Sequence, residues 1–169
     1  MKKIILTAAA VFAFSFANAQ ETKFGLTAGV DFASAKVTVP GVTVSETETG
    51  FYLGALVDIT ASEKFHVQPE LLLVFIQDSK QLQLPILAKI FVGEKFSILA
   101  GPDLLFDLEN TEGLKSMGVG FDFGGSYDID KNFSLEAKYN LGITNLVEDA
   151  PNGVSAKISG LFVGVNFKF

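Results

Sequence analysis

The sequence contains no cysteine, no tryptophan and no arginine, and His66 is its single histidine. Without cysteine the chain has no disulfide framework, no thiol nucleophile and no cysteine-ligated zinc. Without arginine it lacks the forked side chain that binds phosphate and carboxylate groups in a bidentate manner. The net charge of −6 and the pI of about 4.7 also argue against a nucleic-acid binder, which needs a basic surface. We therefore expect no nucleic-acid partner.

Charged residues are also scarce, at 19%, whereas hydrophobic residues make up 49% and the mean hydropathy is +0.38. No apolar run after the N-terminus is long enough for a membrane-spanning helix, because the longest is Leu71 to Ile76. The unpaired edge strands of an open sheet are not tolerated in lipid. If this chain enters a membrane, it must do so as a closed β-barrel.

The N-terminal segment has the pattern of a secretory signal peptide. Lys2 and Lys3 precede an apolar run from Ile4 to Phe14, and a small-x-small site ends at Ala19. The run is too short to span a membrane, although a membrane anchor is the alternative interpretation. The pattern predicts a signal peptide over residues 1–19, a mature domain over residues 20–169, and export from the cytoplasm.

The rest of the chain alternates apolar and polar residues with a period of two, which is typical of strands with two unlike faces. From Phe133 to Thr144, for example, apolar residues occupy every odd position. The alternation predicts eight strands, an even number as in bacterial single-chain barrels. Their expected ranges are 24–33, 50–61, 65–77, 81–92, 96–108, 117–129, 133–147 and 155–169.

The connections between these ranges alternate in length. Short turns are expected at 61–64, 93–95 and 130–132, and longer loops at 34–49, 109–116 and 148–154; the link at 78–80 is short on the long-loop side. Phe65, Phe96 and Phe133 each follow a charged short turn directly. Short periplasmic turns, longer outer loops and aromatic girdles at both interfaces are features of outer-membrane barrels.

The polar face decides between two kinds of barrel. It carries many glycines and eight acidic residues but only three lysines, which suits the crowded interior of a narrow barrel better than a solvated surface. We therefore predict an all-β protein, an eight-stranded antiparallel up-and-down transmembrane β-barrel with its apolar face toward lipid. A secreted soluble barrel that binds a ligand inside, as lipocalins do, is the alternative.

One strand carries a family resemblance. Leu82-Gln83-Leu84-Pro85-Ile86-Leu87-Ala88-Lys89 resembles the proline-containing strand motif of the PorT-like, porin-family outer-membrane β-barrel domain, and Val67-Gln68-Pro69-Glu70-Leu71-Leu72 is similar to the strand before it. Leu82 stands where an aromatic residue is common in that family. The resemblance extends over Phe24 to Phe169. The resemblance implies an outer-membrane location and says little about the function of the protein.

Several charged residues are expected inside the barrel as a polar network: Glu70, Lys89, Asp103, Asp122, Glu136 and Lys138. A hairpin centred on Ser79-Lys80 predicts that Glu70 and Lys89 lie opposite one another as an ion pair. Asp103 and Asp122 are expected at similar depths on neighbouring strands. The network is interpreted as a packed polar plug, and a cation-lined passage is the alternative.

The sequence predicts no enzyme and no cofactor. His66 follows a short turn on the inner face, away from the outer rim where a nucleophile and base would need access to substrate. No metal-ligand spacing is present.

The first long loop is predicted to form a β-hairpin that projects from the barrel. Its sequence is palindromic about a turn dipeptide, and pairing across that turn sets Val30 opposite Phe51. Its inner face would be rich in valine, covering the barrel mouth or meeting a partner. The residues of this extracellular hairpin are Val37, Val39, Pro40, Gly41, Val42 and Val44, and a disordered loop is the alternative.

Three functions are consistent with these patterns. The first is a non-enzymatic outer-membrane barrel with a structural or surface-interaction role through its extracellular loops. The second is a narrow channel for cations or small solutes, and the third is a secreted soluble ligand-binding barrel. Expected partners are outer-membrane lipid, an extracellular protein, and the barrel-assembly machinery, which would recognise the C-terminal strand through Phe167 and Phe169.

Overall fold

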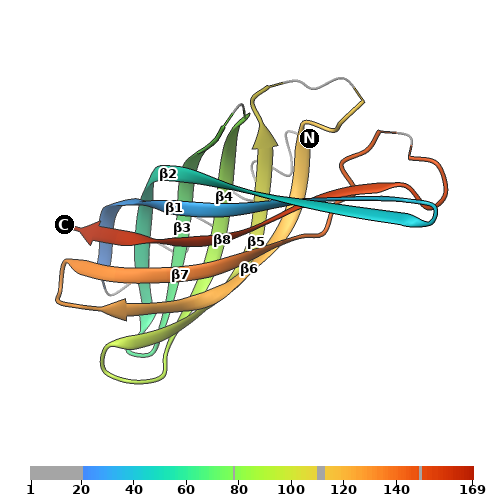
Figure 1. The fold of residues 1–169 in the computed structure, drawn as a ribbon. Helices are drawn as coiled ribbons and strands as arrows, with labels where there is room; N and C mark the ends of the chain where they lie inside the picture. Colours follow the sequence, from blue (N-terminus) through green and yellow to red (C-terminus); the bar gives the residue numbers. More distant parts are fainter. Residues whose placement is uncertain (1–20, 78, 110–112, 149) are drawn as a thin grey trace, which may run out of the picture.

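The computed structural model describes residues 21–77, 79–109, 113–148 and 150–169, and these residues form a closed antiparallel barrel of eight strands in sequential order (Figure 1). The predicted fold class is confirmed, whereas the predicted signal peptide lies outside the described residues. The strands are β1 (Glu21–Val39), β2 (Val42–Ser62), β3 (Phe65–Ile76), β4 (Ser79–Phe91), β5 (Phe96–Asp107), β6 (Met117–Asp128), β7 (Phe133–Gly142) and β8 (Ser155–Lys168).

The period-two pattern becomes an inner and an outer wall. In β7 the side chains alternate between exposed and buried from Phe133 to Asn140, with the polar residues buried and the apolar ones exposed. Exposed apolar side chains surround the barrel on all eight strands. This arrangement is the reverse of a water-soluble barrel and gives the wall an apolar belt.

Strands β1 and β2 are much longer than the other six and project from the barrel, with the first residues of β8 paired beside β1. They contain 19 and 21 residues, whereas crossing a membrane takes about 9–11. Their pairing continues without a break from Glu21–Thr60 to Val39–Val42, so the predicted projecting hairpin and its Val30–Phe51 register are confirmed. The long ribbon at the right of Figure 1 is this hairpin. We call this end of the barrel the hairpin end and the other the turn end.

Short turns close the turn end. In the β6–β7 turn, the carboxylate of Asp130 accepts hydrogen bonds of 2.8 Å from the backbone N–H groups of Asn132 and Phe133. These bonds stabilise the charged carboxylate and lower the pKa of Asp130 below its ordinary value. The turn is thereby fixed by its own aspartate.

Two predicted boundaries were wrong. Ile76 pairs with Ser79, so the β3–β4 hairpin is centred two residues earlier than Ser79-Lys80. Gln77 adopts a positive φ of 32° in this turn, a conformation that is uncommon for glutamine and is not predicted from the sequence. Strand β7 ends at Gly142 rather than at residue 147, because the Thr144 hydroxyl accepts the N–H of Val119 and takes the chain out of the ladder.

Phenylalanines mark the turn end as expected. Phe24, Phe65, Phe96 and Phe133 all expose more than a third of their surface on the outer wall, and Phe133 packs against Phe167 with ring centroids 4.9 Å apart. None of the described residues belongs to a helix that is long and apolar enough to cross a membrane.

Candidate functional site

The middle of the lumen is occupied by one lysine and two glutamates. The ammonium group of Lys138, which is 2% exposed, forms ion pairs with Glu70 and with Glu136 Oε1, the latter at 3.2 Å. Gln68 donates its amide to both carboxylates, at 2.7 and 3.1 Å, and Asn166 donates to Glu136 at 2.9 Å. We call these five residues the central cluster. They come from β3, β7 and β8, so the cluster joins opposite walls.

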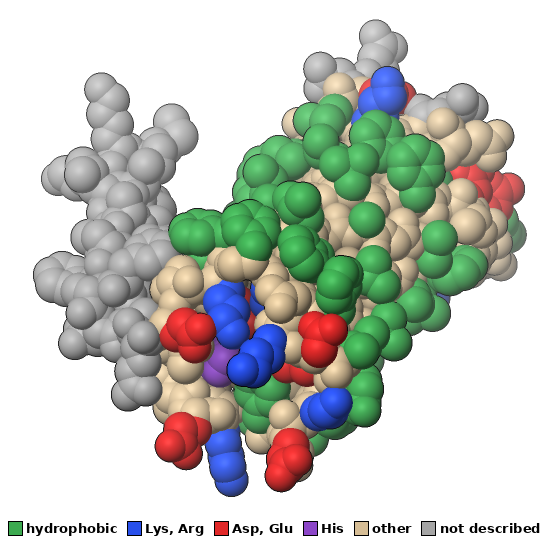
Figure 2. Space-filling view, turned by 90° about the vertical axis from the view of Figure 1, so that its left-hand side faces the viewer, with side chains coloured by type: hydrophobic (Ala, Val, Ile, Leu, Met, Phe, Trp, Pro, Cys, Tyr) green, Lys and Arg blue, Asp and Glu red, His purple; other side chains and the backbone are tan. Residues whose placement is uncertain are grey.

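A second group of charges lies at the turn end, and we call it the turn-end cluster: Asp58, His66, Lys89, Asp128 and Lys168. Asp58 is its hub, because its carboxylate accepts from His66 Nδ1 at 2.6 Å and from Lys168 Nζ at 2.8 Å. Lys89 contacts Asp128 at 3.3 Å and Asp58 at 3.9 Å. Figure 2 looks onto this end, where acidic, basic and histidine side chains fill the opening.

The predicted Glu70–Lys89 pair was wrong. The earlier turn between β3 and β4 brings His66, not Glu70, opposite Lys89. Glu70 is neutralised by Lys138 from the far wall, and Lys89 by the turn-end aspartates. A register shift that leaves every side chain on its predicted face is enough to change all the partners.

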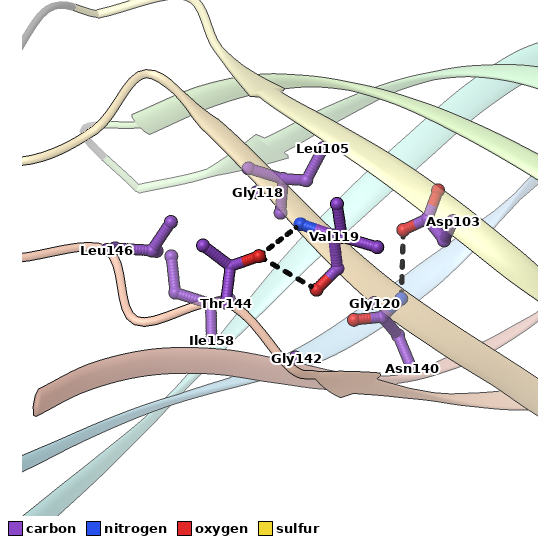
Figure 3. A pocket seen from close by; sticks show the side chains of 10 residues that line it. All are labelled: Asp103, Leu105, Gly118, Val119, Gly120, Asn140, Gly142, Thr144, Leu146 and Ile158. Atoms are coloured by element: carbon purple, nitrogen blue, oxygen red, sulfur yellow. Dashed lines mark hydrogen bonds between the residues drawn. The ribbon is translucent and has the colours of Figure 1, made fainter.

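Asp103 and Asp122 form a third group, which we call the acid pair. Each is 1% exposed, and the amide of Asn140 donates to Asp103 Oδ2 at 2.8 Å and to Asp122 Oδ1 at 2.6 Å. A small recess beside Asp103 and Asn140 opens toward the hairpin end. Figure 3 shows Asp103 and Asn140 at one end of this recess and Thr144 and Leu146 at the other.

Apolar side chains fill the lumen on the hairpin side of the central cluster. Tyr52 and Phe162 pack edge to face with centroids 5.4 Å apart, and Phe162 also lies 6.0 Å from the Lys138 ammonium. We call this group the apolar cap, and its members are Ala33, Tyr52, Leu72, Val74, Ile76 and Phe162. Polar clusters and apolar cap together fill the barrel interior, as expected for eight strands.

The structure thus places all six residues of the predicted lumen network inside the barrel, but in three groups instead of one. Three neutral residues that hydrogen-bond to the carboxylates within these groups were not predicted. Gln68, Asn140 and Asn166 carry no charge, so the pattern of charges does not indicate them, although each occupies an inward position of the alternation. The amides of Gln68 and Asn140 each bridge two carboxylates, and the amide of Asn166 donates to Glu136.

The described part of the chain holds no group of three or more histidine, aspartate or glutamate side chains arranged for a metal ion. His66 is bound to Asp58 at the turn end and packs against Phe91, with ring centroids 4.9 Å apart.

The projecting hairpin presents the predicted valines to the surroundings. Val37, Val39, Val42 and Val44 are 40–55% exposed, and Pro40 and Gly41 form the tip, where Gly41 has a φ of 84°. The valines therefore do not bury themselves over the barrel mouth. Strand β8 pairs with β1 as far as Thr38–Ser155, whereas β2 residues 42–49 have only β1 as a described neighbour. One edge of this three-stranded sheet is open.

The two C-terminal phenylalanines lie on the outer wall. Phe167 and Phe169 are 40% and 68% exposed, and the backbone N–H of Phe169 donates to the carbonyl of Phe24 at 2.9 Å. The last residue is thus tied to the first strand.

Comparison with known proteins supports the fold and leaves the family open. No protein-family model and no curated protein matches the sequence. Among solved structures, the attachment invasion locus protein Ail of Yersinia pestis is similar with a TM-score of 0.54 and 15% identity over 89% of this chain and all of that chain. Neisserial surface protein A has a TM-score of 0.52 and 18% identity over the same shares.

A structure of Ail in complex with the heparin analogue sucrose octasulfate has a TM-score of 0.51 at 14% identity, covering 89% of this chain and 100% of that chain. A de novo designed transmembrane β-barrel has a TM-score of 0.54 at 10% identity, covering 89% and 99%. These likenesses show that the chain has the fold of eight-stranded transmembrane barrels.

Proposed function

We propose that this chain is a non-enzymatic outer-membrane protein whose filled barrel anchors the β1–β2 hairpin as a surface for binding another protein. The observation that carries the proposal is the contrast between the two parts. The lumen is packed with buried side chains, while the hairpin extends well past the barrel wall with its valines exposed. A solid anchor with a projecting sheet suits interaction better than transport.

The open edge of β2 is the element best suited to contact a partner. Residues 42–49 present unpaired backbone N–H and C=O groups, which an extended segment of another protein can join as an additional strand. Glu46 and Glu48 point to the same side as Val42 and Val44, so the partner segment would combine apolar with basic side chains. The outer segments at 34–49, 77–80, 108–116 and 143–157 contain seven acids and four lysines.

The excess of acidic residues on these segments also argues against a receptor for polyanions. The sulfated ligand bound to Ail is an anion, and a net acidic surface would repel it. We therefore expect protein rather than a sulfated sugar as the partner.

We further propose that the segment 1–19 directs export and that the barrel inserts into the bacterial outer membrane. The apolar belt would contact lipid, and Phe167 and Phe169 on the C-terminal strand would be recognised by the barrel-assembly machinery. The exposed positions of both phenylalanines on the outer wall support that role. We also propose that the chain is a member of the PorT-like family that its sequence resembles.

A hairpin variant tests the surface role. A double variant, Val37→Thr with Val44→Thr, changes one cross-strand pair on the valine face while keeping β-branched residues. We expect it to insert normally, as judged by heat-modifiable gel mobility, and to lose contact with the partner. Contact is measured in intact cells by photo-cross-linking from a reactive residue at position 46, which lies on the valine face.

The matched control changes the opposite face. Thr38 and Thr43 form the neighbouring pair, with hydroxyl oxygens 3.3 Å apart. Thr38→Val with Thr43→Val should leave the adduct in place. A wild-type hairpin that yields no protein adduct, or an adduct that survives on the altered valine face, would contradict the proposal.

A narrow channel is the second candidate, since the lumen contains more acids than lysines. The filled interior argues against it, because Lys89 is fully buried and Lys138 nearly so. In planar lipid bilayers we expect no steady single-channel current from the wild-type barrel, with an open porin as the positive control. Steady conductance that changes with salt would favour the channel over the anchor.

A further inference from the structure

The outer face of the projecting sheet differs in composition from the barrel wall below it. Phe32 of β1 and Leu161 of β8 stand opposite one another on the outer wall, and each is 41% exposed. The alternation of the outer wall continues from them into the sheet, where the acids Glu46 and Glu48 belong to the other face. Between the apolar belt and the hairpin tip, the outer face consists of serine, threonine and lysine: Ser34, Lys36, Thr38, Thr43, Ser45, Thr47, Thr49, Ser155, Lys157 and Ser159.

The two lysines of this face form a cross-strand pair. Lys36 stands opposite Lys157 in the β1–β8 ladder, and both side chains are exposed. Like charges placed directly opposite one another destabilise an antiparallel pair. Among the residues that the structure describes, no acid forms an ion pair with either lysine. The lysine pair is therefore an uncompensated positive charge at the junction that closes the barrel.

The height of the lysine pair above the apolar belt matches the polar layer of a membrane. Phe32 and Leu161 form the last apolar row, a row of two serines follows, and the lysines form the next row. Four residues of strand extend about 13 Å, or roughly 10 Å along the axis of a tilted barrel. The polar layer of a bilayer is about 5–8 Å thick on each side. Because lysine side chains are long and can turn back toward this layer, their ammonium groups can reach lipid phosphates.

We propose that Lys36 and Lys157, with the hydroxyl groups around them, bind the phosphate of an anionic lipid in the leaflet at the hairpin end. A phosphate between the two ammonium groups removes their mutual repulsion and accepts charge-assisted hydrogen bonds from both. Neighbouring serine and threonine hydroxyls can donate to its remaining oxygens. The acyl chains of the same lipid lie along the apolar belt below, so the headgroup and the chains are held together.

This lipid site is compatible with the acidic net charge of the outer segments. A soluble polyanion meets the field of all these segments, whereas a lipid phosphate lies beside one face only. Charges in solution are screened over about 8 Å at physiological ionic strength. The nearest groups on the outer face are the two lysines and neutral hydroxyls, while Glu46 and Glu48 lie on the other face.

Native mass spectrometry of the refolded barrel in detergent measures the binding. Dipalmitoyl phosphatidic acid is the probe, and dipalmitoyl phosphatidylcholine is the lipid with the same chains and no net charge. We expect the wild type to retain phosphatidic acid about tenfold better, because each lysine near an anionic lipid adds to the attraction. Lys36→Gln with Lys157→Gln should lose this preference, whereas Lys36→Arg with Lys157→Arg should keep it because both charges remain.

The matched control removes two other lysines from the same end of the barrel. Lys80 lies 4.0 Å from Glu109, and Lys80→Gln with Lys115→Gln leaves the lysine pair intact, so the preference should persist. Heat-modifiable mobility shows that each variant is folded. Without anionic lipid, the variant with both glutamines at 36 and 157 should resist urea at least as well as the wild type, because the repulsion between the lysines is gone.

Three results would overturn the proposal. Equal retention of the two lipids by the wild type, or a preference that survives in the folded glutamine variant, would show that the lysine pair does not bind the headgroup. Lower resistance to urea in that variant without anionic lipid would give the lysines a structural role instead. Inorganic phosphate should not displace the lipid, because it lacks acyl chains; displacement at comparable concentration would make the free anion the ligand.

Discussion

A Lys138→Met variant is expected to lose about 3–5 kcal/mol of unfolding free energy. Methionine fills a similar volume, so the loss comes from charge rather than from a cavity. Glu70 and Glu136 would remain buried and close together without the ammonium that now binds both. Urea-induced unfolding in lipid vesicles, followed by circular dichroism or by heat-modifiable mobility, measures the change.

Lys157→Met is the matched control, since Lys157 is an exposed lysine of β8. It should change the unfolding free energy by no more than about 0.5 kcal/mol. Adding Glu70→Gln to Lys138→Met should recover part of the loss, because it removes one of the two uncompensated charges. Equal effects of Lys138→Met and Lys157→Met would show that the central cluster does not stabilise the barrel through its charges.

A Phe162→Ala variant should have an effect of similar size for a different reason. Phe162 is 2% exposed and packs between Tyr52 and the Lys138 ammonium. Its removal leaves a cavity in the apolar cap, and the expected cost is about 3–5 kcal/mol in the same unfolding measurement. The variant should still be closed to ions, because both charged clusters remain in place.

Phe121→Ala is the comparison for this change. Phe121 is 41% exposed on the outer wall, so its removal leaves no enclosed void. We expect a clearly smaller loss of unfolding free energy than at Phe162. If the two substitutions cost the same, or if Phe162→Ala conducts ions steadily, the interior is less tightly packed than the structure indicates.

The sequence predicts whether a side chain faces the lumen or the outer wall better than it predicts which side chains form ion pairs. The period of two assigns each residue of β7 to the correct wall, and the palindrome about Pro40-Gly41 gives the register of the longest hairpin. Both features are local, because they depend on alternation and on one turn. Membrane barrels repeat such local rules strand by strand.

The ion pairs could not be predicted from such local features. The link between β3 and β4 contains no glycine or proline, and the turn forms at Gln77, two residues before the expected centre. Lysine also reaches across a narrow lumen, so Lys138 binds a glutamate from β3, which is not a neighbouring strand. Which side chains form ion pairs across the barrel depends on strand tilt and on barrel closure, and the sequence of a single strand determines neither.

The junction of β1 and β8 has a consequence for how the barrel forms. Every other pair of neighbouring strands is a hairpin of consecutive segments, whereas this junction joins residues as distant as Gly25 and Lys168. Closing so long a loop is entropically costly and slow compared with forming local hairpins. During folding, closure of the barrel therefore competes with pairing between an exposed edge strand and a neighbouring chain. The fourteen residue pairs at this junction, extended by the projecting part of β1, favour completion of the ring.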